Sequence, residues 1–291
     1  MKTWSFSDLK RECISQNMTV WQLAQLEQAQ YSDISIDKVR SIVLEHIKVM
    51  QNTIKTGMLS DEKSISGLCG DDCKKLIERY SKKNALFGKI FQKIAIYALA
   101  SSEENSRMGK IAACPTAGSC GIVSSVLVAY GEEYNSSADE LINFLITAGK
   151  IGSIISNKVQ LAGAVAGCQA ECGSAAAMCA SALVQIMGGN IDEILNAAAL
   201  ALKNLLGLTC DPVCGLVEVP CVKRNVFTAL HAVCAAELAL AGIESKIPPD
   251  EVLDAMKQTG RLMSPLLKES AQAGLAATKT ALELKTKIFA K

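Results

Sequence analysis

Apolar residues recur every three or four positions through most of this chain, which is the spacing that predicts amphipathic α-helices. Thr19 and Ser35 stand where the N-caps of two such helices are expected, and Gly57 stands where the second is expected to stop. The apolar positions of that second helix are Ile36, Val39, Ile42, Val43, Ile47 and Met50. No segment alternates apolar and polar residues as a strand does, so the pattern predicts an all-α fold.

The most apolar stretch, roughly residues 161–189, is rich in Ala, Gly and Cys. It also contains Gln169, Glu171 and Gln185, whereas a span that faces lipid needs about 20 residues that are nearly all apolar. We therefore predict a helix that is buried at the centre of the protein or at a subunit interface. We find neither a repeat nor a linker, and predict one large helical domain over residues 1–291, with its N-terminal helices in residues 1–34.

Composition and charge narrow the possible partners and the compartment. The formal net charge is +1 and no basic stripe stands out, so nucleic acid is not an expected partner. The opening M-K-T-W-S-F-S-D-L-K has no apolar stretch of the kind that secretory signals carry, so we expect a cytoplasmic protein. In a reducing compartment, the twelve cysteines are expected to serve as core side chains, metal ligands or catalytic groups.

Three of these cysteines fall within C-D-P-V-C-G-L-V-E-V-P-C, residues 210–221. Its two prolines force the backbone to turn, and a turning backbone can direct several thiols towards one point. Thiolates favour iron–sulfur clusters, zinc or copper(I), and a cluster with three cysteine ligands keeps one iron open as a Lewis acid. The spacing alone allows Cys210, Cys214 and Cys221 as ligands, pairing of this loop with Cys168 or Cys172, or thiols that are merely buried.

Two further segments have the composition of binding loops. C-P-T-A-G-S-C-G, residues 114–121, leads into an apolar helix, and such a helix start can hold an anion or can simply be a capped helix without a ligand. S-G-L-C-G-D-D-C, residues 66–73, is a glycine-rich turn with two thiols, which is weak evidence for a metal because zinc and iron sites draw on two such elements.

Five motifs in this order resemble the α subunit of bacterial iron–sulfur-dependent L-serine dehydratase, an L-serine ammonia-lyase. The resemblance runs from about residue 35 to the C-terminus, and the long motif that begins with Cys210 is the most specific part of it. The motifs are S-G-L-x-G (66–70), P-T-A-G-S (115–119), G-C-Q-A-E (167–171), C-D-P-V-x-G-L-V-E-V-P-C-V-K-R-N (210–225) and G-L-A-A-T (274–278).

The resemblance implies a largely helical enzyme with a 4Fe–4S cluster held by Cys168, Cys210 and Cys221. One iron is then open and binds L-serine directly, and no pyridoxal phosphate is required. Cys172 and Cys214 become bystanders, which the local spacing does not indicate. The implied reaction is the dehydration and deamination of L-serine to pyruvate and ammonia.

Residues near the motifs are candidates for holding the substrate. We expect Thr116, Gly118, Ser119 and Asn157 to bind serine near the cluster. Glu171 is expected to act as a base or to orient a ligand, and Lys223 is a second catalytic candidate because positive charge is unfavourable at a helix start.

The resemblance also implies a separate β subunit, hence a hetero-oligomer, and little turnover by the α chain alone. Cysteines at positions 69, 114 and 120 and an aspartate at position 71 depart from the pattern of the family, which leaves the preference for serine open. The alternatives are a related iron–sulfur lyase, such as an L-cysteine desulfidase, and a non-catalytic, thiol-rich cluster-binding or redox-sensing protein.

Overall fold

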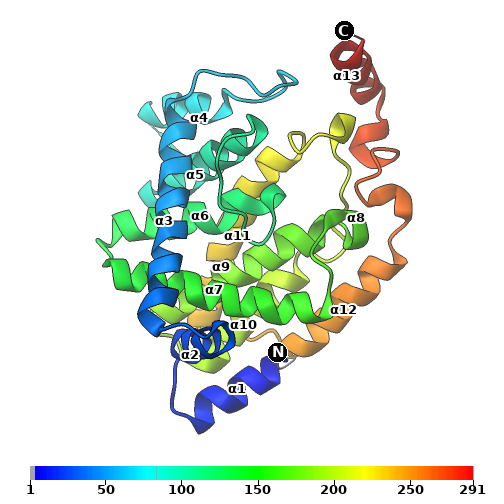
Figure 1. The fold of residues 1–291 in the computed structure, drawn as a ribbon. Coiled ribbons are helices and arrows are strands. Elements are labelled where there is room, and N and C mark those ends of the chain that lie inside the picture. Colours follow the sequence, from blue (N-terminus) through cyan, green and yellow to red (C-terminus); the bar gives the residue numbers. More distant parts are fainter. Residues whose placement is uncertain (1–3, 83, 291) are drawn as a thin grey trace.

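The computed structural model describes residues 4–82 and 84–290, so residues 1–3, 83 and 291 of the predicted domain lie outside the described part. Within that part the chain forms thirteen α-helices and no β-strand, which confirms the predicted all-α fold (Figure 1). The helices are α1 (Phe6–Ser15), α2 (Val20–Ser32), α3 (Ile36–Leu59), α4 (Asp72–Ser81), α5 (Lys89–Ser106), α6 (Cys120–Glu133), α7 (Ala138–Lys158), α8 (Gly163–Ala166), α9 (Ser174–Ile186), α10 (Ile191–Lys203), α11 (Cys221–Leu240), α12 (Pro249–Leu262) and α13 (Lys279–Phe289).

Several helices begin where the sequence predicts, because a side chain satisfies backbone N–H groups that are free in the first turn. The Thr19 hydroxyl caps α2, and the Ser35 hydroxyl caps α3 by accepting a hydrogen bond from the Lys38 amide. At α10 the Asn190 side chain accepts a hydrogen bond from the Glu193 amide, and the Glu193 carboxylate accepts one from the Asn190 amide (2.8 Å). These starts are therefore set by local sequence.

Helix α3 continues past Gly57, so the predicted stop at that residue is wrong. A Cβ atom on Gly57 would lie 2.1 Å from the carbonyl oxygen of Ala100 in α5. Gly57 is therefore required by the close approach of α3 to α5, and not by the end of a helix. The helix ends at Leu59, where Ser60 takes up an extended backbone.

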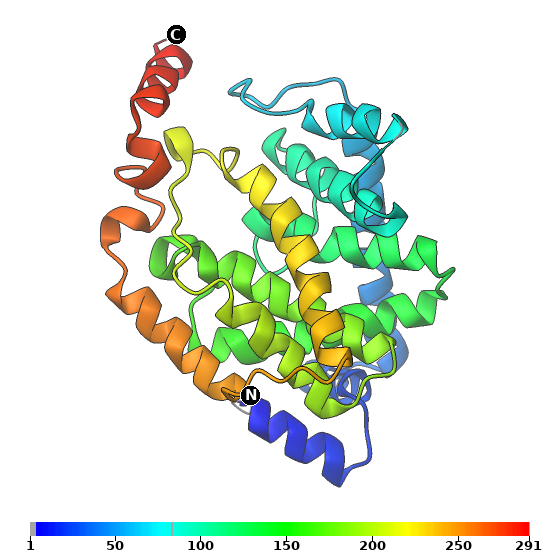
Figure 2. The same ribbon diagram turned by 180° about the vertical axis from the view of Figure 1, so that it is seen from behind.

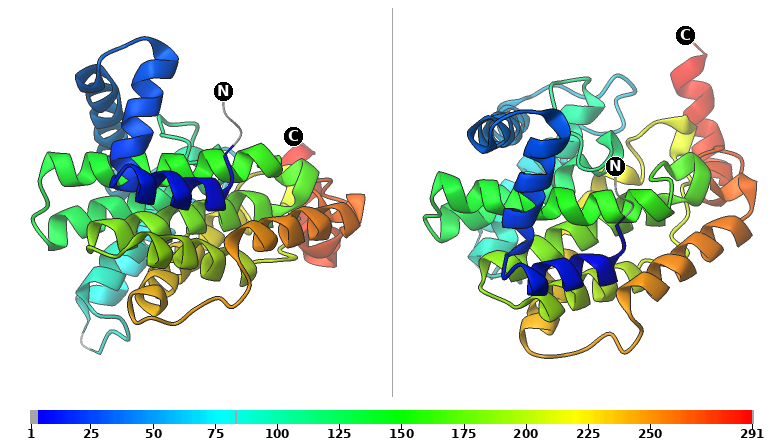
Figure 3. Two further views of the ribbon diagram at one scale, coloured as in Figure 1. Left: turned by 90° about the horizontal axis from the view of Figure 1, so that it is seen from below. Right: turned by 60° about the horizontal axis from the view of Figure 1, so that its bottom comes forward.

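Helix α9 forms the centre of the molecule. Every residue from Ser174 to Val184 is buried, and most of these side chains are Ala, Ser or Cys. Helices α6, α7, α10 and α11 pack directly against α9, which small side chains permit at high packing density (Figures 2 and 3). The predicted small-residue core is therefore present.

The prediction of one continuous helix through residues 161–189 is wrong, because the stretch folds as three pieces. They are α8, a single π-helical turn over Gln169–Gly173, and α9. Gly167 lies between α8 and the π-helical turn with a φ of 77°, a left-handed conformation that glycine adopts without steric cost. Gly167 therefore separates α8 from a helical path that begins at Cys168 and runs through the π-helical turn directly into α9.

The C-terminal segment, from α12 onward, lies along the outside of this bundle. Helix α12 runs along one side, and α13 lies at the opposite end of the molecule from α1 (Figures 1 and 2). Helix α13 contacts two 3₁₀ turns, η3 (Val213–Gly215) and η5 (Gly274–Ala277). Among the residues described, no helix combines the length and the apolar character needed to cross a bilayer.

Candidate metal centre

Four cysteines line a single cavity of about 200 Å³. Three of them, Cys168, Cys210 and Cys221, are the ligands implied by the resemblance, and the fourth is Cys172. Cys214 is not among the lining residues, so the structure does not bring together the three thiols of the loop that local spacing allowed. The other lining residues are Thr116, Ala117, Gly118, Glu171, Pro212, Val217 and Glu269.

The π-helical turn places two of the thiols side by side. Cys168 precedes the turn and Cys172 lies within it, and their Sγ atoms are 3.3 Å apart. A π-helical turn widens the backbone locally, and such turns are frequent at functional sites. The turn also directs Glu171, whose Oε2 atom would lie 2.9 Å from a Cβ atom on Gly163, into the same cavity.

The other two thiols come from the ends of the loop between α10 and α11. Cys210 is held by the chain that follows α12. The Cys210 amide donates a hydrogen bond to the Leu267 carbonyl oxygen (2.9 Å), and the Cys210 carbonyl oxygen accepts one from the Glu269 amide (2.6 Å). Cys221 is the first residue of α11, so the start of that helix positions it. Cys214 lies between them in a left-handed conformation (φ 60°).

Asn225 ties the P-T-A-G-S loop to the start of α11. Its side-chain amide donates to the carbonyl oxygens of Gly118 (2.8 Å) and Cys221 (2.9 Å), and its oxygen accepts from the Gly121 amide (3.0 Å). Asn225 is buried, so all three bonds are shielded from water. The loop that carries Gly118 is therefore fixed relative to Cys221.

A buried carboxylate, Asp211, joins the last motif to the loop of Cys210. It accepts a hydrogen bond from Arg224 (2.9 Å) and one from the Leu275 amide (2.8 Å). A Cβ atom on Gly274 would lie 2.6 Å from Asp211 Oδ2, so only glycine fits at that position. Arg224 also donates to the Thr209 carbonyl oxygen, which makes it a structural cation beside the cavity.

A second buried carboxylate, Glu218, holds the glycine-rich turn at residues 66–70. It accepts hydrogen bonds from Ser64 (2.7 Å), Ser66 (2.5 Å) and the thiol of Cys69 (3.4 Å). Glu218, Asn225 and Asp211 therefore join three of the other motifs to the long motif at 210–225. The sequence pattern indicates no role for these three residues, although each lies within the long motif at 210–225.

The thiols differ in how readily they lose a proton. The hydrogen bond from Cys172 lowers the pKa of the Cys168 thiol despite its burial, and the Arg224 guanidinium lowers it further. Burial raises the pKa of Cys210, and it raises that of Cys221 to about 12, with a further increase from the Cys168 charge. Burial likewise raises the pKa of the Glu171 carboxyl, and the nearby Thr116 hydroxyl opposes that shift.

The donor set suits a thiolate-held cluster better than a single ion. Among the residues described, no three His, Cys, Asp or Glu side chains are placed to hold one ion. A single zinc ion needs its ligands to converge at about 2.3 Å, whereas a cluster of several irons binds each cysteine at a different iron. Several thiols around one cavity, with a guanidinium nearby, match the second arrangement.

Three of the predicted site residues lie away from the cavity lining. Ser119 is fully buried behind the loop and bonds to the hydroxyl of Thr116 (3.0 Å). Asn157 lies on an exposed position in the last turn of α7. Lys223 forms an ion pair with Asp72 of α4.

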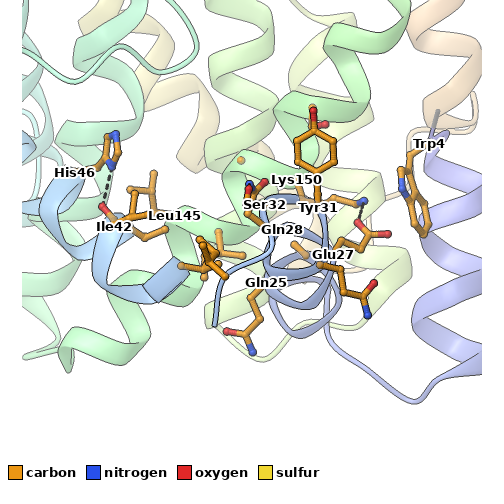
Figure 4. Close-up of a pocket in the computed structure, with 18 residues that line it drawn as sticks. Trp4, Gln25, Glu27, Gln28, Tyr31, Ser32, Ile42, His46, Leu145 and Lys150 are labelled. Atoms are coloured by element: carbon orange, nitrogen blue, oxygen red, sulfur yellow. Dashed lines mark hydrogen bonds and ion pairs between the residues drawn. The ribbon is translucent and has the colours of Figure 1, made fainter. Parts of the chain in front are cut away.

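A larger cavity, of about 700 Å³, lies between α2, α3 and α7 (Figure 4). No cysteine lines it. Lys150 forms an ion pair with Glu27 and lies 3.8 Å from the centre of the Trp4 ring. His46 lies 2.8 Å from the Ile42 carbonyl oxygen, so the ring is engaged by its own helix. This cavity offers no thiol for a soft metal.

The helical fold and the thiol-lined cavity define an all-α protein with a candidate site for an iron–sulfur cofactor. Residues 15–276 match the family described as "Serine dehydratase alpha chain". The chain belongs to this family, which confirms the resemblance noted in the sequence.

Named relatives cover most of the chain. It is 46% identical over 244 residues to the "Probable L-serine dehydratase, alpha chain" of Bacillus subtilis (84% of this chain, 81% of the relative). It is 37% identical over 273 residues to the "L-serine dehydratase, alpha chain" of Peptoniphilus asaccharolyticus (94% of each). It is 38% identical over 248 residues to the "L-serine dehydratase" of Streptomyces coelicolor (82% of this chain, 53% of the relative).

Proposed function

We propose that this protein is the catalytic α subunit of an L-serine dehydratase, and that Cys168, Cys210 and Cys221 hold a 4Fe–4S cluster. The observation that carries the proposal is that these three thiols, far apart in sequence, line one cavity in a member of the serine dehydratase alpha chain family. When bound, the cluster supplies an open iron that withdraws electron density from the carboxylate and hydroxyl of serine. The Arg224 guanidinium favours the thiolate form of Cys168, which a metal ligand requires.

The residues of the chain would supply the remaining chemistry. Thr116 and Gly118 line the same cavity as the thiols and would hold the substrate. Glu171 is the carboxylate on the π-helical turn, and it would accept the α-proton of serine at one of its oxygens. Return of this proton to the β-hydroxyl as the C–O bond breaks releases one water molecule and leaves aminoacrylate. Aminoacrylate rearranges to an imine, which takes up water and gives pyruvate and ammonia.

The proposed enzyme is completed by a separate β subunit. The relatives from B. subtilis and P. asaccharolyticus are named alpha chains, and the relative from S. coelicolor, named without a chain, is nearly twice as long as the aligned segment. The purified α chain is therefore expected to show little turnover, and addition of the β chain is expected to restore it. Full serine deamination by the cluster-loaded α chain alone would contradict this expectation.

The experiment that tests the function is anoxic reconstitution with iron and sulfide, followed by titration with L-serine. We expect about four irons for each chain, a spectral change at one iron when L-serine binds, and pyruvate formation with the β chain present. Sulfide release from L-cysteine should be much slower than pyruvate formation from L-serine. A bound cluster that does not respond to L-serine would instead indicate a non-catalytic cluster protein.

A further inference from the structure

The cysteine cavity has an unbalanced set of charged side chains. Among the residues described, its only charged lining groups besides the thiols are the carboxylates of Glu171 and Glu269. No Lys, Arg or His is among those lining residues, and the nearest guanidinium considered above, Arg224, is engaged by Asp211 and by the Thr209 carbonyl oxygen. The protein side of this cavity therefore favours a positively charged group.

An α-amino acid brings such a group into the cavity. If the proposed function holds, serine presents a carboxylate and a hydroxyl to the open iron, and its α-ammonium group remains to be paired. An ammonium group that leaves water without an anionic or hydrogen-bonding partner is strongly destabilised. Besides the thiols, the two carboxylates are the anionic acceptors that the described lining residues offer to this group.

Glu171 lies on the inner side of the cavity. A Cβ atom on Gly163 would come within 2.9 Å of its carboxylate, and one on Gly118 within 3.6 Å. It is thus confined between α8 and the P-T-A-G-S loop, next to the thiols. This position suits a group that acts on the α-carbon.

Glu269 lies at the exposed rim of the same cavity. Its carboxylate has no hydrogen bond or ion pair with any residue of the described chain, although its backbone is tied to Cys210 by the bond of 2.6 Å. The backbone φ angle is 60° at Glu269 and 54° at Ala271. Two residues that are not glycine therefore adopt the left-handed conformation within three positions of the chain. Such conformations persist only where the surrounding structure holds them, and they concentrate at functional sites.

We propose that Glu269 binds the α-ammonium group of the substrate and thereby selects amino acids over the corresponding hydroxy acids. The backbone on either side of this residue is held by the parallel bridge between Cys210 and Lys268 and by the Glu269 amide, so the backbone position of Glu269 is coupled to that of a proposed cluster ligand. A charged acceptor at this point pairs with the ammonium without occupying the iron. The inner carboxylate of Glu171 stays available for the α-proton.

The test compares two ligands in two variants of the cluster-loaded complex. L-Serine and 3-hydroxypropionate share the carboxylate and the β-hydroxyl, but only serine carries the ammonium group. Dissociation constants are measured for each ligand from the spectral change of the cluster and from calorimetry, without turnover. Glu269→Gln is expected to raise the dissociation constant of L-serine about tenfold and to leave that of 3-hydroxypropionate unchanged.

The matched control is Glu283→Gln on the exposed side of α13, which should leave both constants unchanged. An equal loss for both ligands in Glu269→Gln would mean that the residue only supports the segment, and it would overturn the inference. Loss of discrimination in Glu171→Gln instead of Glu269→Gln would overturn it as well. A wild-type complex that binds neither ligand would refute the proposed function itself, and the inference would fall with it.

Discussion

The same side chain has different chemistry at different positions in this protein, as its cysteines demonstrate. Burial raises the pKa of Cys114 and of Cys120 to about 12, so these thiols stay protonated and pack as small apolar groups. Cys168 is equally buried, but the adjacent Cys172 thiol and the Arg224 guanidinium lower its pKa. A neighbouring donor and a positive charge, not exposure, therefore distinguish Cys168 from the core thiols, whereas Cys210 and Cys221 differ from them by their place on the cavity wall.

Replacement of single cysteines tests the proposed ligand set. Cys168→Ala is expected to lose most of the bound iron and sulfide, because it removes a thiol from the cavity. Cys214→Ala is expected to keep the cluster, since Cys214 does not line the cavity. Iron and sulfide analysis after anoxic reconstitution measures both. The reverse result would contradict the proposed ligands and would favour Cys210, Cys214 and Cys221 of the loop.

Removal of the Asn225 side chain tests whether this buried amide holds the substrate loop. Asn225→Ala leaves the Gly121 amide and two carbonyl oxygens without partners, so we expect the free energy of unfolding to fall by about 2–3 kcal/mol. The exposed Asn157 provides the control, and Asn157→Ala should stay within about 0.5 kcal/mol of the wild type. Urea unfolding measures the free energy of unfolding of both variants, and an unchanged m-value shows that the change is one of stability. Equal stability of the two variants would contradict the role of Asn225.

At the scale of elements, the cavity exists because the central stretch is not one regular helix. The left-handed Gly167 separates α8 from the π-helical turn, and the turn then carries Cys168, Glu171 and Cys172 to the cavity wall. Gly163 at the start of α8 has no side chain, which leaves room for Cys210 and Glu171. The size of the site therefore depends on a glycine that carries no chemistry.

Addition of one methyl group tests that dependence. In Gly163→Ala the new Cβ would lie 2.9 Å from Cys210 Sγ and from Glu171 Oε2, so overpacking should cost about 1–3 kcal/mol and reduce the iron content. Gly149 in α7 has no atom within 4 Å of its added Cβ, so Gly149→Ala should stabilise the protein by about 0.5–1 kcal/mol. Thermal unfolding and iron analysis measure the contrast. Normal iron content in Gly163→Ala would contradict the proposed position of the cluster.

At the scale of the whole molecule, the site is assembled from segments that span most of the sequence. Glu218 holds the turn at residues 66–70, Asn225 holds the P-T-A-G-S loop, and Asp211 holds the segment that begins at Gly274. Each anchor is a buried polar side chain from the region 210–225, so that region organises three of the other motifs. Loss of one anchor should release one segment and leave the helical bundle intact.

Asp211→Ala tests this organisation. It leaves Arg224 without its carboxylate partner and the Leu275 amide without an acceptor. We therefore expect the free energy of unfolding to fall by about 3 kcal/mol, and a protease to cleave rapidly within the segment that follows Met263. The exposed ion pair of Glu244 with Lys246 is the control, because Glu244→Ala should change neither property. Limited proteolysis followed by mass spectrometry gives the cleavage sites. Cleavage spread evenly along the chain would instead indicate global unfolding.

The helical fold could be predicted in large part from the sequence, because its signals act within a few residues. Thr19 and Ser35 cap the helices that follow them, as the pattern predicts. Gly57 misled the prediction, since a glycine that ends a helix and one that permits close packing look alike in a sequence. The continuous central helix failed for a related reason: small apolar residues favour burial but do not specify a π-helical turn.

Periodicity, capping residues and motifs are sufficient to predict the class of fold, several helix starts and the family from the sequence. Only the tertiary structure decided that Cys172 and Glu269 share a cavity with the three implied ligands, and that Asn157 and Lys223 lie elsewhere. The reason is the separation along the chain of the residues that interact. Helix capping and periodicity depend on neighbours three or four residues away, whereas the cavity wall depends on hydrogen bonds and packing between segments more than 50 residues apart.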